Sequence, residues 1–200
     1  MTSAAKTNFD SHLTQCYEAI EIYSHLKQRG YSADFGLRFV WVSSVSALDH
    51  YVSELIIEKS TEQFANQGIL STKLLNEGVP LQASMRMNSS SATQAIVEFR
   101  SFIEQVVRFR TFQKSKDIAD GLSYIWNEQH KWEKISDKLG LKPKSAKYKL
   151  NSIGYRRDLI VHNADCDSYT GKLKECTTTE ASEALNYIKE TVEIIEDLVP

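Results

Sequence analysis

Apolar residues recur every three or four positions along most of the chain, which is the spacing of the buried face of an α-helix. The first stripe lies within residues 8–29 and the second within residues 34–67. A glycine follows each stripe, Gly30 and Gly68, where a helix is expected to end. The first half of segment 34–67 is apolar or small on all sides, so we expect it to be the central and most buried helix.

Residues 68–90 lack a clear period and contain Gly78, Pro80 and a pair of serines, Ser89 and Ser90. This composition predicts a long irregular excursion between two helical regions. Its length is near the upper limit for a segment without secondary structure in a compact domain.

Helical spacing resumes after the excursion. Ser91 and Gln94 form a capping-box pattern that predicts the start of a helix reaching about Arg110. From about Lys116 the apolar spacing returns and continues until Gly140. We therefore expect further helical structure over residues 116–140.

Two long helices are predicted in the last third of the chain. Pro143 suits the first turn of a helix that reaches about His162. Thr177 and Glu180 form another capping box before a final amphipathic segment. Residues 163–176 between them are rich in Asn, Asp, Ser and Gly and are predicted to be a loop.

The sum of these elements is an all-α bundle of four long helices with short extra helices. The 200 residues suit one domain over 1–200, with a core over about 8–198. Hydrophobic residues make up 42% and charged residues 25%, which excludes a disordered chain. No internal repeat is visible, which excludes a fibrous one.

Charge and cysteine content exclude several classes of function. The formal net charge is −2, so no global basic field attracts nucleic acid. No apolar run approaches the ~20 residues of a membrane span, and no apolar stretch precedes Phe9, so we expect a cytoplasmic protein without membrane contact. The three cysteines form no CxxC pair, and no metal-ligand cluster or phosphate-binding glycine motif is present.

One charged residue interrupts an apolar stripe. Arg157 lies between Ile153 and Ile160 on the predicted buried face of segment 143–162. A buried arginine is costly unless it is paired. The simplest explanation is a structural arginine bonded to backbone carbonyls or to an acid such as Asp49.

The residues after Arg157 suggest a different explanation. Asp158, three apolar residues, His162 and Asn163 follow in order, and this pattern resembles the Arg-x4–6-His signature of the HEPN superfamily. The resemblance is to the stand-alone HEPN families associated with restriction, toxin and RNA-degradation systems, and it extends over roughly residues 35–198. It also rests on Phe112-Gln113-Lys114, Asp117-Ile118, Trp132, Ile135, Leu139 and the run Ser46-Ala47-Leu48-Asp49-His50-Tyr51.

The resemblance implies a metal-independent endoribonuclease without a cofactor. It implies that Arg157 holds the scissile phosphate, that His162 is the base or acid, and that Asp158 orients one of them. It also implies a homodimer in which the two motifs face each other through helix 143–162. A bacterial toxin or antiphage effector fits this family, with an antitoxin or defence-system partner on another chain. Histidine and arginine suit this chemistry because one transfers protons near neutral pH and the other binds phosphate oxygens.

The spacing of the motif poses a geometric problem. On an ideal helix, Arg157 and His162 lie about 140° apart. They can point in one direction only if the helix ends or distorts near His162, or if they meet in a groove shared by two chains.

Basic residues precede the motif. Between Lys142 and Arg157 there are six basic residues and no acid, which suggests a lane for an RNA backbone, although a solvated helix face explains them equally well. Asp49 and His50 are candidates to contact and position Arg157 or His162. The candidate RNA-binding residues are Lys144, Lys147, Asn151, Arg156 and Asn163.

Two alternatives to an enzyme remain open at this point. One is a catalytically silent HEPN module that serves as a dimerisation or RNA-binding partner. The other is a helical adaptor with no connection to RNA. The intact Arg-Asp-x-x-x-His run favours the enzyme, because a silent module need not keep it.

Overall fold

The computed structural model describes residues 2–167 and 169–200 of the chain, and nine helices account for most of them. These residues contain no strand, only one isolated antiparallel bridge between Cys166 and Leu173. The all-α architecture expected from the apolar spacing is confirmed. The helices are α1 (Ala4–Gln28), α2 (Asp34–Ala65), α3 (Thr72–Leu75), α4 (Leu81–Ser89), α5 (Ala92–Val107), α6 (Ser115–Leu122), α7 (Lys131–Lys138), α8 (Pro143–His162) and α9 (Thr178–Leu198).

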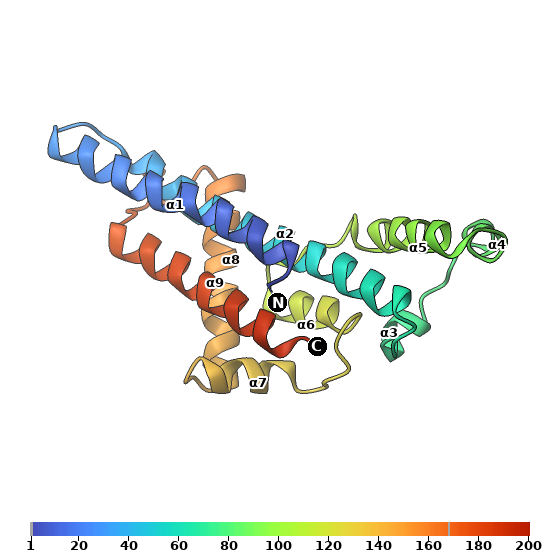
Figure 1. Cartoon of the computed structure of the whole chain (residues 1–200). Coiled ribbons are helices and arrows are strands. Elements are labelled where there is room, and N and C mark those ends of the chain that lie inside the picture. The colour runs from blue at the N-terminus through green and yellow to red at the C-terminus, as the bar shows by residue number, and fades with distance from the viewer. Residues whose placement is uncertain (1, 168) are drawn as a thin grey trace.

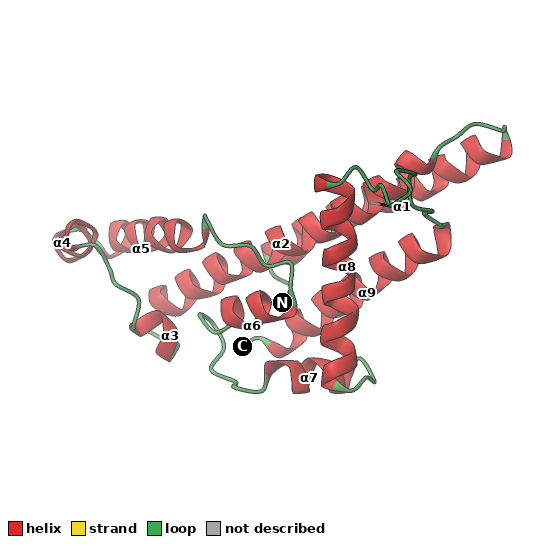
Figure 2. Cartoon of the chain, turned by 180° about the vertical axis from the view of Figure 1, so that it is seen from behind, coloured by secondary structure: helices red, strands yellow, loops and turns green. Residues whose placement is uncertain are grey.

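Four long helices form the main bundle. α1 and α2 make a long hairpin, α9 lies against both of them, and α8 crosses α2 at a steep angle (Figures 1 and 2). The two termini lie close together (Figure 1). Ser3 ties them, because its backbone N–H and its hydroxyl donate to the carboxylate of Glu196 at 2.7 and 2.9 Å. α5 packs against the C-terminal half of α2, and α4 and α5 together form an arm at that end of the molecule (Figure 1).

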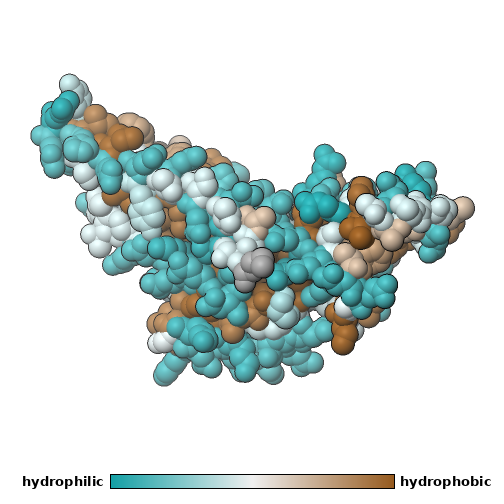
Figure 3. All heavy atoms as spheres, viewed as in Figure 1, coloured by the Kyte–Doolittle hydropathy of each residue, from teal (hydrophilic) through white to brown (hydrophobic). Residues whose placement is uncertain are grey.

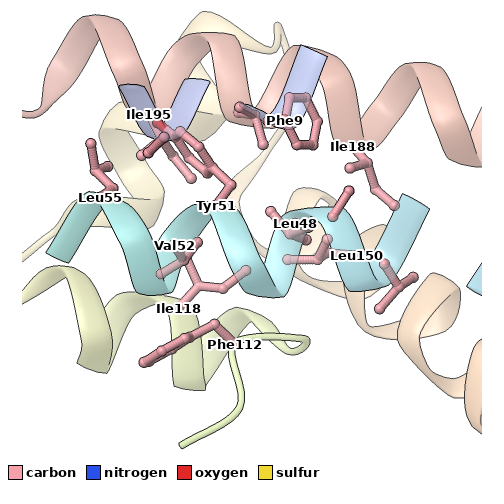
Figure 4. Packing of buried hydrophobic residues seen from close by; sticks show 14 of the residues in the cluster. Phe9, Leu48, Tyr51, Val52, Leu55, Phe112, Ile118, Leu150, Ile188 and Ile195 are labelled. Atoms are coloured by element: carbon pink, nitrogen blue, oxygen red, sulfur yellow. The ribbon is translucent and has the colours of Figure 1, made fainter. Parts of the chain in front are cut away.

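α2 is the central helix, as its nearly continuous apolar sequence predicted. It packs against α1, α5, α6, α8 and α9. Figure 4 shows side chains of α2 directed to both sides, Tyr51 toward Ile195 and Val52 toward Ile118. All four of these side chains are buried. Because α2 is packed on several sides, the positions of its remaining exposed residues are also fixed.

The expectation of an irregular segment over 68–90 is corrected, because α3 and α4 lie within it. Ser71 caps α3 by accepting the backbone N–H of Leu74, and its hydroxyl donates to the carbonyl of Tyr124. α4 begins directly after Pro80. Neither helix shows a clear apolar period, because Leu74 and Ala83 are the only buried side chains they contribute.

The continuous helical spacing expected over 116–140 is interrupted in the structure. α6 ends at Leu122 and α7 begins at Lys131. The apolar spacing continues through the break because Tyr124 and Ile125, which lie in the connecting turn, are themselves buried in the core. The buried residues of this turn therefore fall at the spacing expected of a helix, although they are not helical.

α8 and α9 begin where the sequence predicts. Pro143 is the first residue of α8, and Thr177 and Glu180 form the complete capping box of α9. The connecting loop is anchored by Asp165, whose side chain is fully buried. Its carboxylate lies 2.8 Å from Nε of Arg38 and 2.9 Å from Nη1 of Arg156.

Most of the visible surface is hydrophilic (Figure 3). Apolar surface gathers at the free end of the α1–α2 hairpin and over the α4–α5 arm (Figure 3). Ile22 and Phe35 in the hairpin and Leu81 and Met85 in the arm are exposed. Within the described residues, every helix is too short or too polar to cross a lipid bilayer.

Candidate functional site

Arg157 lies on the inward face of α8, in register with the buried Leu150 and Ile153. Its side chain is only 18% exposed, and Nη1 lies 3.3 Å from the carboxylate of Asp158. Its Nε–H is buried and has no acceptor among the described residues. An unpaired buried donor costs about 1–3 kcal/mol, so an acceptor that reaches this N–H is favoured.

A loop between α5 and α6 forms one wall beside Arg157. Asp49 of α2 holds this loop, because its carboxylate accepts the backbone N–H of Phe112 at 2.6 Å and the side-chain amide of Gln113 at 2.8 Å. Gly154 of α8 packs against the same loop, and a Cβ there would lie 3.0 Å from the carbonyl oxygen of Gln113. Asp49 therefore holds the wall of the site and does not pair with Arg157. The acid that contacts Arg157 is its neighbour Asp158.

These elements enclose an open polar pocket of about 280 Å³. His50 and Asp49, the two expected supporting residues, both line it together with Arg157. The sequence analysis assigned the other members no role in a site, although Ser46 and Gln113 belong to the segments that carry the family resemblance. These other members are Ser46, Ser53, Arg110 and Gln113.

Arg110 contributes less charge to the pocket than its position suggests. Its guanidinium lies 3.4 Å from Glu77 and 3.5 Å from Asp120, and its Nε–H donates to the carbonyl of Val106. Of the two arginines that line the pocket, Arg157 is therefore the one that keeps an N–H group without an acceptor. Asp158, which contacts Arg157 at 3.3 Å, also lies 4.0 Å from Lys114.

His162 is the last residue of α8, so the helix ends near it, as the sequence analysis required for the two side chains to converge, but it shows no distortion before that residue. Ideal helical geometry places Arg157 and His162 about 140° apart around the helix axis. The chain reverses only afterwards, where Ala164 and Asp165 adopt positive φ angles of 50° and 56°. His162 is exposed at the end of the helix and does not line the pocket of Arg157.

The candidate RNA-binding residues fall into two groups. Lys144 and Lys147 are exposed on α8, and Asn163 is exposed at its end. Asn151 is also exposed, but its side-chain oxygen accepts the backbone N–H of Ser115 at 2.9 Å and so supports the start of α6.

The RNA-binding expectation for Arg156 is corrected by its contacts. Its Nη2 donates to the carboxylate of Asp165 at 3.0 Å and to the carbonyl of Glu175 at 3.0 Å. Its side chain is only 18% exposed. Arg156 therefore holds the loop after α8 in place, and its neighbour Arg157 is the arginine that faces the pocket.

The outer face of α8 also carries two tyrosines that sequence reasoning passed over. Tyr148 and Tyr155 are 73% and 63% exposed. They are seven residues apart, and His162 lies seven residues further on, so all three share one helical face. The seven-residue spacing is visible in the sequence and is enough to place both tyrosines on the same helical face as His162.

The comparisons with known proteins agree with this architecture. The family described as RiboL-PSP-HEPN matches residues 12–199, nearly the whole chain, so the protein belongs to the HEPN superfamily. No curated protein and no solved structure matches it. Across the described residues, no group of three or more His, Cys, Asp or Glu side chains is arranged to hold a metal ion.

Proposed function

We propose that this protein is a metal-independent endoribonuclease of the HEPN type that acts as a homodimer. The observation that carries the proposal is Arg157, a family-motif arginine held in an open polar pocket with a donor unpaired. A guanidinium so placed binds two phosphate oxygens and stabilises the charge of a pentavalent phosphate. Asp158 limits its rotation through the contact at 3.3 Å.

The proton transfers require a histidine, and the motif supplies His162. A neutral imidazole takes the proton of the ribose 2′-hydroxyl, whose oxygen attacks the adjacent phosphorus and displaces the 5′-oxygen of the next nucleotide. The products are a 2′,3′-cyclic phosphate and a 5′-hydroxyl. Because the nucleophile belongs to the RNA, a 2′-deoxy strand is inert. Since the base must be neutral, cleavage declines at acid pH.

The geometry of α8 supports a site shared by two chains. Arg157 lines the pocket, whereas His162 is exposed at the end of α8 and does not line it. A two-fold axis near the C-terminal half of α8 brings the exposed His162 of each protomer to the pocket of the other. Closed two-fold dimers are also the commonest homo-oligomers.

The primary test is cleavage of total RNA by the purified protein in EDTA. We expect cyclic-phosphate ends, and a loss of about 100-fold or more in Arg157→Ala and in His162→Ala. The double variant should be scarcely worse than either single one, because residues that act as a unit are not additive. Products with 3′-hydroxyl ends, or full activity of His162→Ala, contradict the proposal.

A complementation experiment tests the shared site. Arg157→Ala and His162→Ala proteins are mixed in equal amounts and allowed to exchange subunits. If each site takes Arg157 from one chain and His162 from the other, each mixed dimer holds one intact site, and about one quarter of wild-type activity returns. If both residues act from the same chain, no activity returns.

We further propose that this activity serves as a bacterial toxin or antiphage effector, restrained or triggered by a partner on another chain. Expression is then expected to slow growth of a bacterial host. The toxicity should disappear in Arg157→Ala and in His162→Ala. Equal toxicity of the variants and the wild-type protein contradicts this role.

One observation favours a second candidate, a catalytically silent HEPN module that binds RNA or a partner. The separation of Arg157 from His162 within the chain is the arrangement that a non-catalytic pocket would tolerate. Binding of RNA without cleavage, unchanged in His162→Ala and reduced in Arg157→Ala, distinguishes this candidate from the enzyme.

A further inference from the structure

A second hollow lies beside the pocket of Arg157. It has a volume of about 410 Å³ and lies between α1 and α2. Ser46 and His50 line both spaces, so the two adjoin each other. The remaining lining residues are His12 and Gln15 of α1 and Ser43 and Ala47 of α2.

The hollow follows from the choice of side chains on α2. Ser43, Ser46, Ala47 and His50 recur at helical spacing on one face, and three of these four side chains are small. Elsewhere the α1–α2 seam is filled by large groups such as Phe9, which packs on the ring of Tyr51 at 5.7 Å. The small residues leave a hollow in the seam beside the pocket of Arg157.

The chemistry of the hollow suits a nucleoside. The rings of His12 and His50 lie edge to face with centroids 6.1 Å apart and offer flat surfaces for a base. Gln15 presents an amide that both donates and accepts, and the serine hydroxyls do the same. None of the six lining residues is a carboxylate, so the hollow does not repel a phosphate attached to its occupant.

We propose that this hollow is a nucleoside subsite that takes the RNA residue next to the phosphate held by Arg157. The proposal rests on the ribonuclease function and extends it by adding His12, Gln15 and Ser43 to the substrate contacts. His50 stands on the wall between the two spaces and contacts both the nucleoside and its phosphate. The ligand is a nucleoside 3′-phosphate unit, as a free nucleotide or within a single strand of RNA.

The direct test follows the histidine ring signals of the full-length protein by NMR. The probes are a nucleoside 3′-monophosphate and a short 2′-O-methyl oligonucleotide, which cannot be cleaved. We expect the signals of His12 and His50 to shift with both probes. His25, exposed near the other end of the same helix α1, is the matched control and should not shift. Shifts with the mononucleotide alone overturn the assignment to RNA.

Variants give a second readout. His12→Ala is expected to weaken oligonucleotide binding about tenfold, the usual effect of removing one stacking ring, whereas His25→Ala changes nothing. Ser43→Phe fills the hollow without touching the pocket of Arg157, so it should reduce oligonucleotide binding and leave binding of inorganic phosphate intact. Circular dichroism confirms that each variant is folded.

The outcomes separate this inference from the proposed function. If His12→Ala and Ser43→Phe bind the oligonucleotide normally while Arg157→Ala abolishes cleavage, the subsite is overturned and the ribonuclease stands. If His12 and His50 shift on binding but the wild-type protein cuts no RNA, the subsite is supported and the ribonuclease function fails. If no probe shifts His12 or His50, the subsite is overturned whatever the activity.

Discussion

Asp165 offers the sharpest test of how the end of α8 is held. Its side chain is fully buried, and its carboxylate lies 2.8 Å from Arg38 and 2.9 Å from Arg156. Arg38 also donates to the carbonyl of Lys174 at 2.8 Å. The carboxylate therefore joins α2, α8 and the loop between α8 and α9 at one point, directly after His162.

The substitution Asp165→Asn removes the charge and keeps the shape. Asparagine tolerates the left-handed backbone of this position, where φ is 56°, so backbone strain does not confuse the result. Removing one partner of a buried ion pair costs about 3–5 kcal/mol, because the remaining charge stays buried without compensation. Here two arginines lose their partner, so we expect a loss at the upper part of that range.

Urea unfolding followed by circular dichroism measures the loss, with Asp158→Asn as the matched control. Asp158 is 34% exposed and pairs with Arg157 at 3.3 Å, so the same substitution there should cost about 1 kcal/mol or less. If the two variants lose similar free energy of unfolding, Asp165 does not act as the buried anchor that its contacts indicate.

Three other substitutions or conditions test the structure. Gly154→Ala is expected to cost about 1–3 kcal/mol in urea unfolding and to reduce RNA cleavage, because its Cβ would lie 3.0 Å from the carbonyl of Gln113; unchanged stability contradicts the close approach. Ala164→Gly should raise the free energy of unfolding by up to about 1 kcal/mol, since φ is 50° at this exposed position, and a loss of stability refutes that reasoning. Burial raises the pKa of Tyr187 to about 12, so its contribution to stability is complete below its unfolded value of about 10 and is lost as the pH rises through 12. Urea midpoints measured across this range should fall less steeply in Tyr187→Phe than in the wild-type protein.

The sequence was most informative where local chemistry sets the structure. Pro143 and the capping box of Thr177 and Glu180 mark the starts of α8 and α9, because each acts within a single turn of helix. The break between α6 and α7 was not predictable, because Tyr124 is buried in a turn by distant parts of the chain. Periodicity records burial, and it identifies a helix only where the buried residues are also helical.

In the candidate site, too, the local motif was predictable, whereas contacts with distant residues were not. The motif located Arg157 from sequence, but Arg156 looked equally suited to bind RNA. One residue along a helix is a rotation of about 100°, and this rotation directs Arg156 to Asp165 and Arg157 to the pocket. The buried partner lies in a loop, and nothing local in the sequence assigns it to one arginine or the other.

The regularity of α8 determines what kind of site the protein can form. With α8 helical to His162, ideal helical geometry directs Arg157 and His162 to positions about 140° apart around the helix. We propose that the two residues act on one phosphate when a second chain presents its His162. A protomer alone still offers Arg157 beside His50, His12 and a hollow of nucleoside size. In this proposal one protomer binds the substrate, and the pair performs the chemistry.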